Sequence, residues 1–218
     1  MDVSRQSEVS ELKGPRARTR RLMLETAMRL MQAGATPSVS EVAEAAEVSR
    51  ATAYRYFPSQ SALVQAVVDE ALGPILDWRS KSTDAERRVA DLLDTGMPRI
   101  EKFEATFKAA LKLSLDHWAR REAGTLGAEP AFARGNRRDL LADAIGPLED
   151  RLAPRAFSRL AQALSLVFGI EALVVLKDIW GLSGPDTLKV TQWAARALVH
   201  EALLEATGTD REVSTGAA

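Results

Sequence analysis

The sequence predicts an all-α fold of about nine helices, in which an N-terminal three-helix head with a helix-turn-helix is joined to a larger helical body. Three observations favour this class. The good helix formers Ala, Leu, Glu and Arg dominate, whereas Tyr, Phe and β-branched runs are scarce. No stretch shows sustained alternation of apolar and polar residues. Apolar residues recur instead at the i, i+3, i+4 and i+7 spacing of one helix face.

Composition argues against several classes of protein. The 218-residue chain contains no cysteine and two histidines, so disulfides, thiolate zinc sites, cysteine nucleophiles and multi-histidine metal centres are not expected. The N-terminal residues lack the apolar core of a signal peptide, and no uninterrupted apolar run reaches ~18 residues. We therefore expect a globular cytoplasmic protein with no membrane span, no bound metal and no cofactor.

Capping and helix-breaking residues predict where the first two helices of the head begin and end. The helix expected over Arg16–Ala33 carries its apolar residues on one face, with Gly34 as a C-terminal cap and Pro37 as a block to continuation. Ser38 stands three residues before Glu41, which is the spacing of a capping box and opens a short second helix that extends through Ala46.

Capping serines and a proline also predict a third and a fourth helix. Ser49 is placed to cap a very short helix over Arg50–Phe57, which Pro58 ends, and Ser59 caps the next helix. That fourth helix is expected either to stop at Gly73-Pro74 or to continue beyond it with a kink. Phe57 is expected to be a core residue that packs the third helix onto the first.

After residue 80 the pattern changes to longer helices. Gly/Ala-rich sequence containing Pro130 separates two groups of them and is expected to be a loop. The polar residues 1–15 and 208–218 are expected to be a flexible arm and a flexible tail. The expected helices are Asp84–Thr95, Pro98–Arg121, Asn136–Leu152, Pro154–Trp180 and Pro185–Thr207.

Charge is distributed unevenly along the chain. Residues 13–60 contain eight Lys and Arg against four Glu, a net charge of +4, so the remainder of the chain carries −5. A basic head on an acidic body suggests that a polyanion binds at one end of the protein.

The third helix offers the chemistry that reading DNA requires. Arg50, Thr52, Tyr54, Arg55 and Tyr56 lie within seven residues. An arginine can donate two hydrogen bonds to guanine, and a threonine can contact a base edge or a thymine methyl. Tyrosine hydroxyls suit phosphate oxygens. The structural alternative, a solvated face on an ordinary helical bundle, is disfavoured by the preceding short helix, the turn spacing and the basic first helix.

The string SVSEVAEAAEVSRATAYRYFPSQSAL, together with the helix before it, resembles the DNA-binding domain of the tetracycline-repressor-like (TetR) family over residues 16–63. The resemblance implies a homodimeric transcription regulator with a head over residues 16–62 and a ligand-binding and dimerisation domain over residues 63–207. It implies two recognition helices on a palindromic operator in double-stranded DNA, and a small-molecule effector whose commonest action is to release repression.

Two positions depart from the family pattern. Glu47 stands where the family often has Gly, and a left-handed conformation there would cost on the order of 1 kcal/mol. Gln60 stands where the family commonly has a phosphate-binding Lys, so it releases no counterion. Arginines at the start of the first helix are expected to compensate. The predicted DNA-binding residues are Arg50, Thr52, Tyr54, Arg55, Tyr56, Ser49, Ser38, Gln60 and Arg18.

The body carries a wide apolar surface on its last two helices, and such a surface on a globular protein usually means a partner. The alternative is that these helices form the core of the monomer. The residues expected at a dimer interface are Leu166, Ile170, Val174, Trp193, Ala194 and Ala197. The residues expected to line a pocket for a largely apolar ligand are Phe103, Phe107, His117, Trp118, Phe168 and Glu171.

Within these sets, Phe103 and Phe107 are expected on one helix face. Glu171 lies inside an apolar run and needs a partner, for which His200, Arg196 and a ligand are candidates. Two other classes of function are alternatives. One is an adaptor that keeps the head as a scaffold, and the other is a helical enzyme, for which the sequence shows no phosphate loop, nucleophile elbow or metal-ligand spacing.

Overall fold

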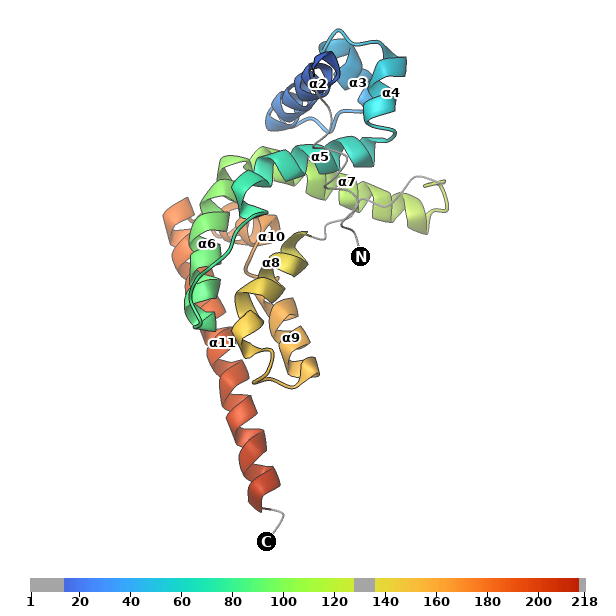
Figure 1. Ribbon diagram of the computed structural model, residues 1–218. Helices are drawn as coiled ribbons and strands as arrows, with labels where there is room; N and C mark the ends of the chain where they lie inside the picture. The colour runs from blue at the N-terminus through green and yellow to red at the C-terminus, as the bar shows by residue number, and fades with distance from the viewer. Residues whose placement is uncertain (1–13, 128–135, 216–218) are drawn as a thin grey trace. The chain divides into compact units, whose positions relative to one another are not determined.

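The computed structural model describes residues 14–127 and 136–215, with side chains described as far as Thr207. Within these residues the chain forms helices and turns and no strand, as Figure 1 shows. The chain divides into two compact units, one of residues 1–70 and 105–133, the other of residues 71–104 and 134–218. The expected N-terminal arm lies almost wholly outside the described residues, as does much of the loop around Pro130.

The first unit begins with the expected head. Its helices are α2 (Pro15–Gln32), α3 (Val39–Ala45), α4 (Arg50–Tyr56) and the greater part of α5 (Gln60–Leu72). Gly34, with φ +87°, turns the chain after α2. These bounds confirm the four helices predicted for the head to within a residue or two.

The core of the head is built from the apolar faces of its short helices. Helix α3 packs against both α2 and α4. Phe57 is only 2% exposed, and the Arg20 guanidinium of α2 lies 5.6 Å from the centre of its ring, which confirms the predicted contact between the end of α4 and α2. The other buried residues of this core include Met23, Leu24, Ala27, Met31, Val42, Ala43, Ala46 and Ala53.

The break between the next two helices does not lie where the sequence predicts it. Helix α6 (Ala85–Lys102) runs through Pro98, and α7 (Glu104–Glu122) begins after Phe103. A proline removes one backbone hydrogen bond, and the buried side of an 18-residue amphipathic helix outweighs that loss. Phe103 therefore caps α6 while Phe107 lies on α7, so the expectation that they share one helix face is wrong.

The second unit is a layered bundle around α6. Helix α11 (Gly184–Thr215) and helix α8 (Asn136–Ile145) pack along α6, and α9 (Pro154–Leu164) packs against α8 and α11. Short 3₁₀ turns follow α5 and α8, namely η1 (Gly73–Ile75) and η2 (Gly146–Leu148). The stop after α5 at Gly73 is one of the two outcomes that the sequence left open.

The single long helix expected over Pro154–Trp180 is wrong. Helix α9 ends at Leu164, tight turns occupy residues 165–169, and Gly169 has φ +126°. The chain then forms α10 (Ile170–Leu173) and a π-helix, η3 (Val174–Ile179). The run is apolar nearly all round, so periodicity gives no sign of the break, which Gly169 alone makes sterically easy.

The last helix is longer than predicted, because α11 continues to Thr215 rather than ending near Thr207. It buries Thr187, Thr191, Ala195 and Val199 at four-residue intervals, which is the face that meets α6. None of the described helices is both long enough and apolar enough to cross a membrane.

Candidate nucleic-acid interface

Helix α4 presents a polar face to solvent. Its buried residue is Ala53, whereas Arg50, Tyr54 and Arg55 are exposed and Tyr54 keeps 46% of its surface. The Arg55 guanidinium lies 5.7 Å from the centre of the Tyr56 ring. Side chains that could hydrogen-bond to DNA therefore point away from the core of the head. The inward face of α4 carries the small residue Ala53, which lets α3 approach closely.

Two hydroxyl pairs accompany this face. The Ser49 hydroxyl accepts a hydrogen bond from the Thr52 backbone N–H at 3.3 Å, as expected of a helix cap, and donates to Thr52 Oγ1 at 3.0 Å. The Ser40 hydroxyl of α3 lies 3.2 Å from the Tyr54 hydroxyl of α4. Sequence analysis missed Ser40, because a serine inside a short helix gives no local signal of a partner fourteen residues away.

The turn between α3 and α4 is closed by a residue in a left-handed conformation. Glu47 has φ 54° and is the one residue other than glycine with positive φ in the described part of the chain. The Val48 N–H donates to the Ala43 carbonyl at 2.8 Å, and the Glu47 N–H donates to that of Glu44 at 3.1 Å. The sequence left the conformation of Glu47 open; the structure shows that it is left-handed and that its side chain is exposed.

Two of the predicted DNA-binding residues are engaged within the head. Gln60 Nε2 donates to the carbonyl oxygens of Thr36 at 2.9 Å and Pro37 at 3.1 Å. These bonds brace the α2–α3 loop and engage the amide group that a phosphate contact would use. The Ser38 hydroxyl accepts from the Glu41 N–H at 3.2 Å, and Glu41 Oε2 accepts from the Ser38 N–H at 2.7 Å.

The capping box also lowers the pKa of the Glu41 carboxyl group. The hydrogen bond from the Ser38 backbone lowers the pKa of Glu41 below its ordinary value, and the bond from the Ser38 side chain acts in the same direction. Glu41 is therefore held as an anion at the beginning of α3, where the helix dipole favours negative charge.

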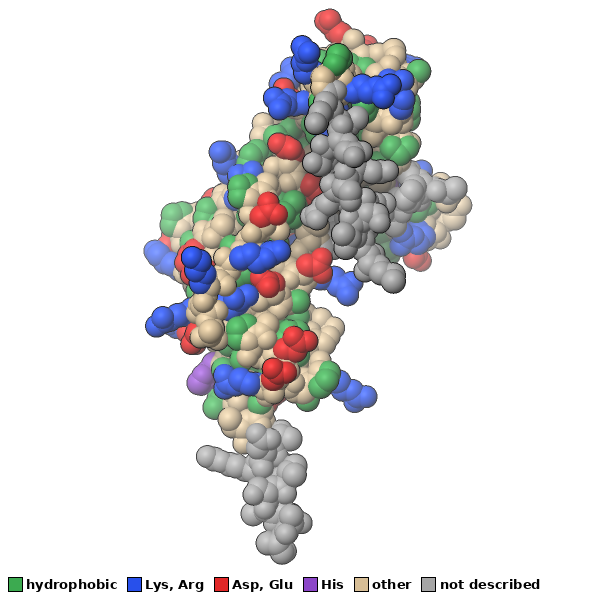
Figure 2. All heavy atoms as spheres, viewed as in Figure 1, with side chains coloured by type: hydrophobic (Ala, Val, Ile, Leu, Met, Phe, Trp, Pro, Cys, Tyr) green, Lys and Arg blue, Asp and Glu red, His purple; other side chains and the backbone are tan. Residues whose placement is uncertain are grey.

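Positive charge on the head is not confined to α4. Arg16, Arg18 and Arg21 on α2 are exposed, and Figure 2 shows Lys and Arg side chains on the part of the molecule that Figure 1 labels α2 to α4. These residues provide the charges that would meet a phosphate backbone around the recognition helix.

The residues expected to line a ligand pocket are divided between the two units. Phe107 and His117 are buried on α7 in the first unit, whereas Phe168 is buried in the second unit against Gly96. Trp118 is 60% exposed, so its place in a pocket is not supported.

The structure shows a partner for Glu171 that the sequence did not suggest. Its carboxylate forms an ion pair with Arg137, whose Nη1 also donates to the Ser165 carbonyl at 3.0 Å. Arg137 therefore holds the turns that precede α10 to the start of that helix. Nothing local in the sequence shows that a tertiary contact recruits Arg137, which lies at the start of α8.

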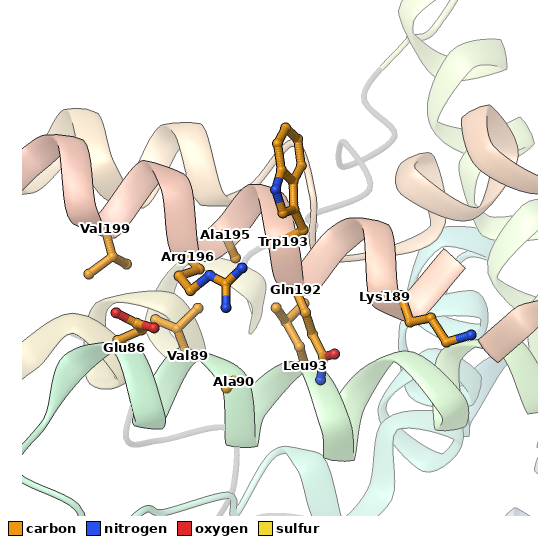
Figure 3. A pocket seen from close by; sticks show the side chains of 10 residues that line it. All are labelled: Glu86, Val89, Ala90, Leu93, Lys189, Gln192, Trp193, Ala195, Arg196 and Val199. Carbon is orange, nitrogen blue, oxygen red and sulfur yellow. The ribbon is translucent and has the colours of Figure 1, made fainter. Parts of the chain in front are cut away.

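A surface groove between α6 and α11 was not anticipated (Figure 3). Val89, Leu93 and Val199 supply its apolar floor, Glu86 and Arg196 stand at its rim, and its volume is about 350 Å³. Figure 3 shows Arg196 reaching from α11 toward α6, whereas the ring of Trp193, which also lines the groove, points away from α6. The remaining lining residues are Ala90, Lys189, Gln192 and Ala195.

The residues expected at a dimer interface differ in exposure. Leu166, Trp193 and Ala197 are exposed, Val174 and Ala194 are half-buried, and Ile170 is buried in the core of the second unit. Ile170 is therefore unsuited to an interface. Exposed apolar residues of α11 and of the segment before it that the sequence analysis did not select are Val175, Ile179, Trp180, Val190 and Leu204.

The all-helical fold and the helix-turn-helix head are those of the class of DNA-binding transcriptional regulators. Residues 23–67 match the family described as bacterial regulatory proteins, tetR family. The match covers the helix-turn-helix, so the head of this chain is similar to the DNA-binding domain of that family.

Comparison with whole proteins adds evidence on the fold. A TetR transcriptional regulator from Rhodococcus sp. RHA1 has a similar crystal structure, with a TM-score of 0.55 and 24% sequence identity, covering 86% of this chain and 97% of that one. The likeness therefore extends beyond the head to the helical body. The comparison with curated proteins gives no match.

Proposed function

We propose that the protein is a homodimeric repressor that binds a palindromic operator and is released by a small-molecule effector in the cytoplasm. The observation that carries the DNA-binding part is the exposed polar face of α4, on which Arg50, Tyr54 and Arg55 are all free of the protein interior. A packed, buried α4 face would have been incompatible with this function.

Each side chain has a role that its geometry permits. Arg50, at the start of α4, is assigned to guanine O6 and N7, and Thr52 to a neighbouring base edge. Tyr54, Tyr56 and the exposed α2 arginines are assigned to phosphates, which set the register of the protein on the duplex. Gln60 is left out of this set because its amide group is engaged by Thr36 and Pro37.

The dimer is supported by the outer face of α11. Val190, Trp193, Ala197 and Leu204 are spaced three, seven and fourteen residues from the first, so they share one side of the helix, and all four are exposed. An apolar stripe of this kind on a surface helix fits a second copy of the chain in an isologous contact. Binding of a palindromic operator would require the two recognition helices to lie about 34–36 Å apart, one turn of DNA.

The effector is expected to act through the second unit. A ligand shifts the protein between two states only by the difference in its affinity for them, which is typically ~1–3 kcal/mol. Phe103 and Phe168 of the predicted pocket residues remain candidates for lining its site, and the groove between α6 and α11 is a second candidate.

The test begins with DNA fragments that the protein selects from genomic DNA. The double variant Arg50→Ala/Tyr54→Ala should lose affinity for those fragments while its sedimentation is unchanged. Arg151→Ala, which removes an exposed arginine from the second unit, is the matched control and should bind normally. Unaltered binding by the double variant would refute the assignment of α4. Selection of no fragment at all would favour the adaptor alternative.

A further inference from the structure

Ser40 and Tyr54 form a polar contact between the two helices of the helix-turn-helix. Ser40 lies on the first turn of α3 and Tyr54 in the middle of α4, and their hydroxyl oxygens are 3.2 Å apart. The two helices pack against each other and lie side by side in Figure 1. The contact is at the surface, since Tyr54 is 46% exposed and Ser40 half-buried.

The pairing restricts an otherwise free side chain. An exposed tyrosine can occupy several staggered rotamers, and DNA binding must select one of them at an entropic cost. A hydrogen bond from a neighbouring helix selects the rotamer before DNA arrives. Its two chain neighbours do not share this role, because Ala53 is buried and Arg55 lies against Tyr56.

Hydroxyl chemistry determines what the pair can offer to a ligand. Each hydroxyl has one proton to donate and two lone pairs to accept with. Whichever of the two donates within the pair, one proton is used there and one remains for an outside acceptor. A DNA phosphate oxygen only accepts hydrogen bonds, so the pair has the one donor that a phosphate contact requires.

We propose that Ser40 is a positioning residue of the DNA interface, which holds the Tyr54 hydroxyl in the orientation that donates to a backbone phosphate. The inference rests on the proposed DNA-binding function and adds to it a residue that does not itself read the sequence. Ser40 acts through Tyr54, so its contribution exists only while the phenolic hydroxyl is present.

This dependence can be measured as a double-mutant cycle on genomic fragments selected by the unaltered protein, by fluorescence anisotropy. Ser40→Ala should weaken binding by roughly two- to tenfold, the range of a single net hydrogen bond. Tyr54→Phe should weaken it at least as much, and the double variant no further than Tyr54→Phe alone. Ser40→Thr, which keeps the hydroxyl, should restore binding. Ser158→Ala, at an exposed serine of α9 in the second unit, is the matched control and should leave DNA binding unchanged.

The outcomes separate this inference from the function on which it rests. If Ser40→Ala binds normally, or if the two losses simply add, Ser40 does not position Tyr54. A melting temperature lowered by Ser40→Ala without rescue by Ser40→Thr would also overturn the inference, because the role would then be structural. Arg50→Ala is measured beside these variants, and if it too binds normally, the proposed DNA-binding face is what has failed.

Discussion

Arg99 Nε donates a hydrogen bond to the carbonyl oxygen of Ala71 at 2.6 Å, which joins the last turn of α6 to the last turn of α5. The carbonyls at a helix C-terminus have no partner within the helix, and a cation there also meets the negative end of the dipole. The same guanidinium lies 5.2 Å from the centre of the Phe103 ring at the end of α6. One side chain therefore fixes the ends of two helices.

We expect Arg99→Ala to lower the free energy of unfolding by about 1–3 kcal/mol, because a charge-assisted hydrogen bond and a ring contact are lost together. Arg99→Lys should recover only part of the loss, since an ammonium does not reproduce the planar donor geometry. Urea denaturation followed by circular dichroism measures both. Exposed Arg138 on α8 offers the control substitution to Ala. Equal stability of the Arg99→Ala and Arg138→Ala variants would contradict the capping role.

Glu47→Gly should increase both stability and DNA affinity. Glycine adopts the left-handed backbone at this turn without strain, which is worth on the order of 1 kcal/mol, and the change removes a negative charge beside the proposed DNA face. Glu47→Ala separates the two effects, because it removes the charge and keeps the strain. The affinity gain should be largest at low salt for both variants, while the gain in unfolding free energy should appear for Gly alone. A stability gain in the alanine variant would contradict the backbone argument.

The Ser38–Glu41 capping box should make the head sensitive to acid. The pKa of Glu41 is lowered in the folded protein, so its contribution to stability is present above the unfolded pKa and is lost as pH falls through the folded pKa. Glu41→Gln retains an acceptor that cannot titrate. Denaturation midpoints of the unaltered protein and of Glu41→Gln, measured from about pH 6 to about pH 3, should therefore converge at the acidic end. Parallel midpoints across the whole range would refute the linkage.

Trp193→Asp should convert the proposed dimer to monomers. The indole is 65% exposed on the apolar face of α11, and a carboxylate buried there by a second copy would lack a partner. Trp118→Asp makes the same chemical change at a tryptophan of similar exposure on α7, and should leave the association unchanged. Sedimentation velocity distinguishes dimer from monomer in both variants. A dimer that persists in Trp193→Asp would place the interface elsewhere.

Gly96→Ala should destabilise the second unit by roughly 1–3 kcal/mol. A Cβ atom at this position would lie 2.6 Å from Cε2 of the Phe168 ring, so α6 or the ring must move. Phe168→Leu in the same chain should recover part of the loss by making room for the methyl group. The melting temperature of the three proteins is the measurement. A glycine replaced without cost would show that the ring is free to shift.

The head could be predicted closely because its signals are local. A capping serine, a glutamate three residues later and a proline after Phe57 each act within one helical turn, and together they determine where α3 and α4 begin and end. The exposed face of α4 followed from the same spacing. Its hydroxyl pairs did not, because Ser40 and Tyr54 meet only through the packing of α3 on α4.

The body was harder to predict because tertiary contacts override local preference there. Pro98 is a strong breaker in isolation, yet α6 passes through it and continues to Lys102. Gly169 allows a reversal inside a run that is apolar throughout. The partner of Glu171 was sought among His200, Arg196 and a ligand, whereas Arg137 is brought to it by a turn that periodicity does not reveal.

The π-helix η3 has a consequence for how the length of this segment is constrained. A π turn holds one residue more than an α turn, so deleting one residue within 174–179 would let the turn become α-helical while the flanking residues keep their faces. The residues inside the turn would be displaced, among them Lys177, whose Nζ contacts Glu101 and Glu104 at 2.7 Å each. A one-residue change in length, and not a change in residue type, would then be enough to break the ion pairs that join η3 to the end of α6 and the start of α7.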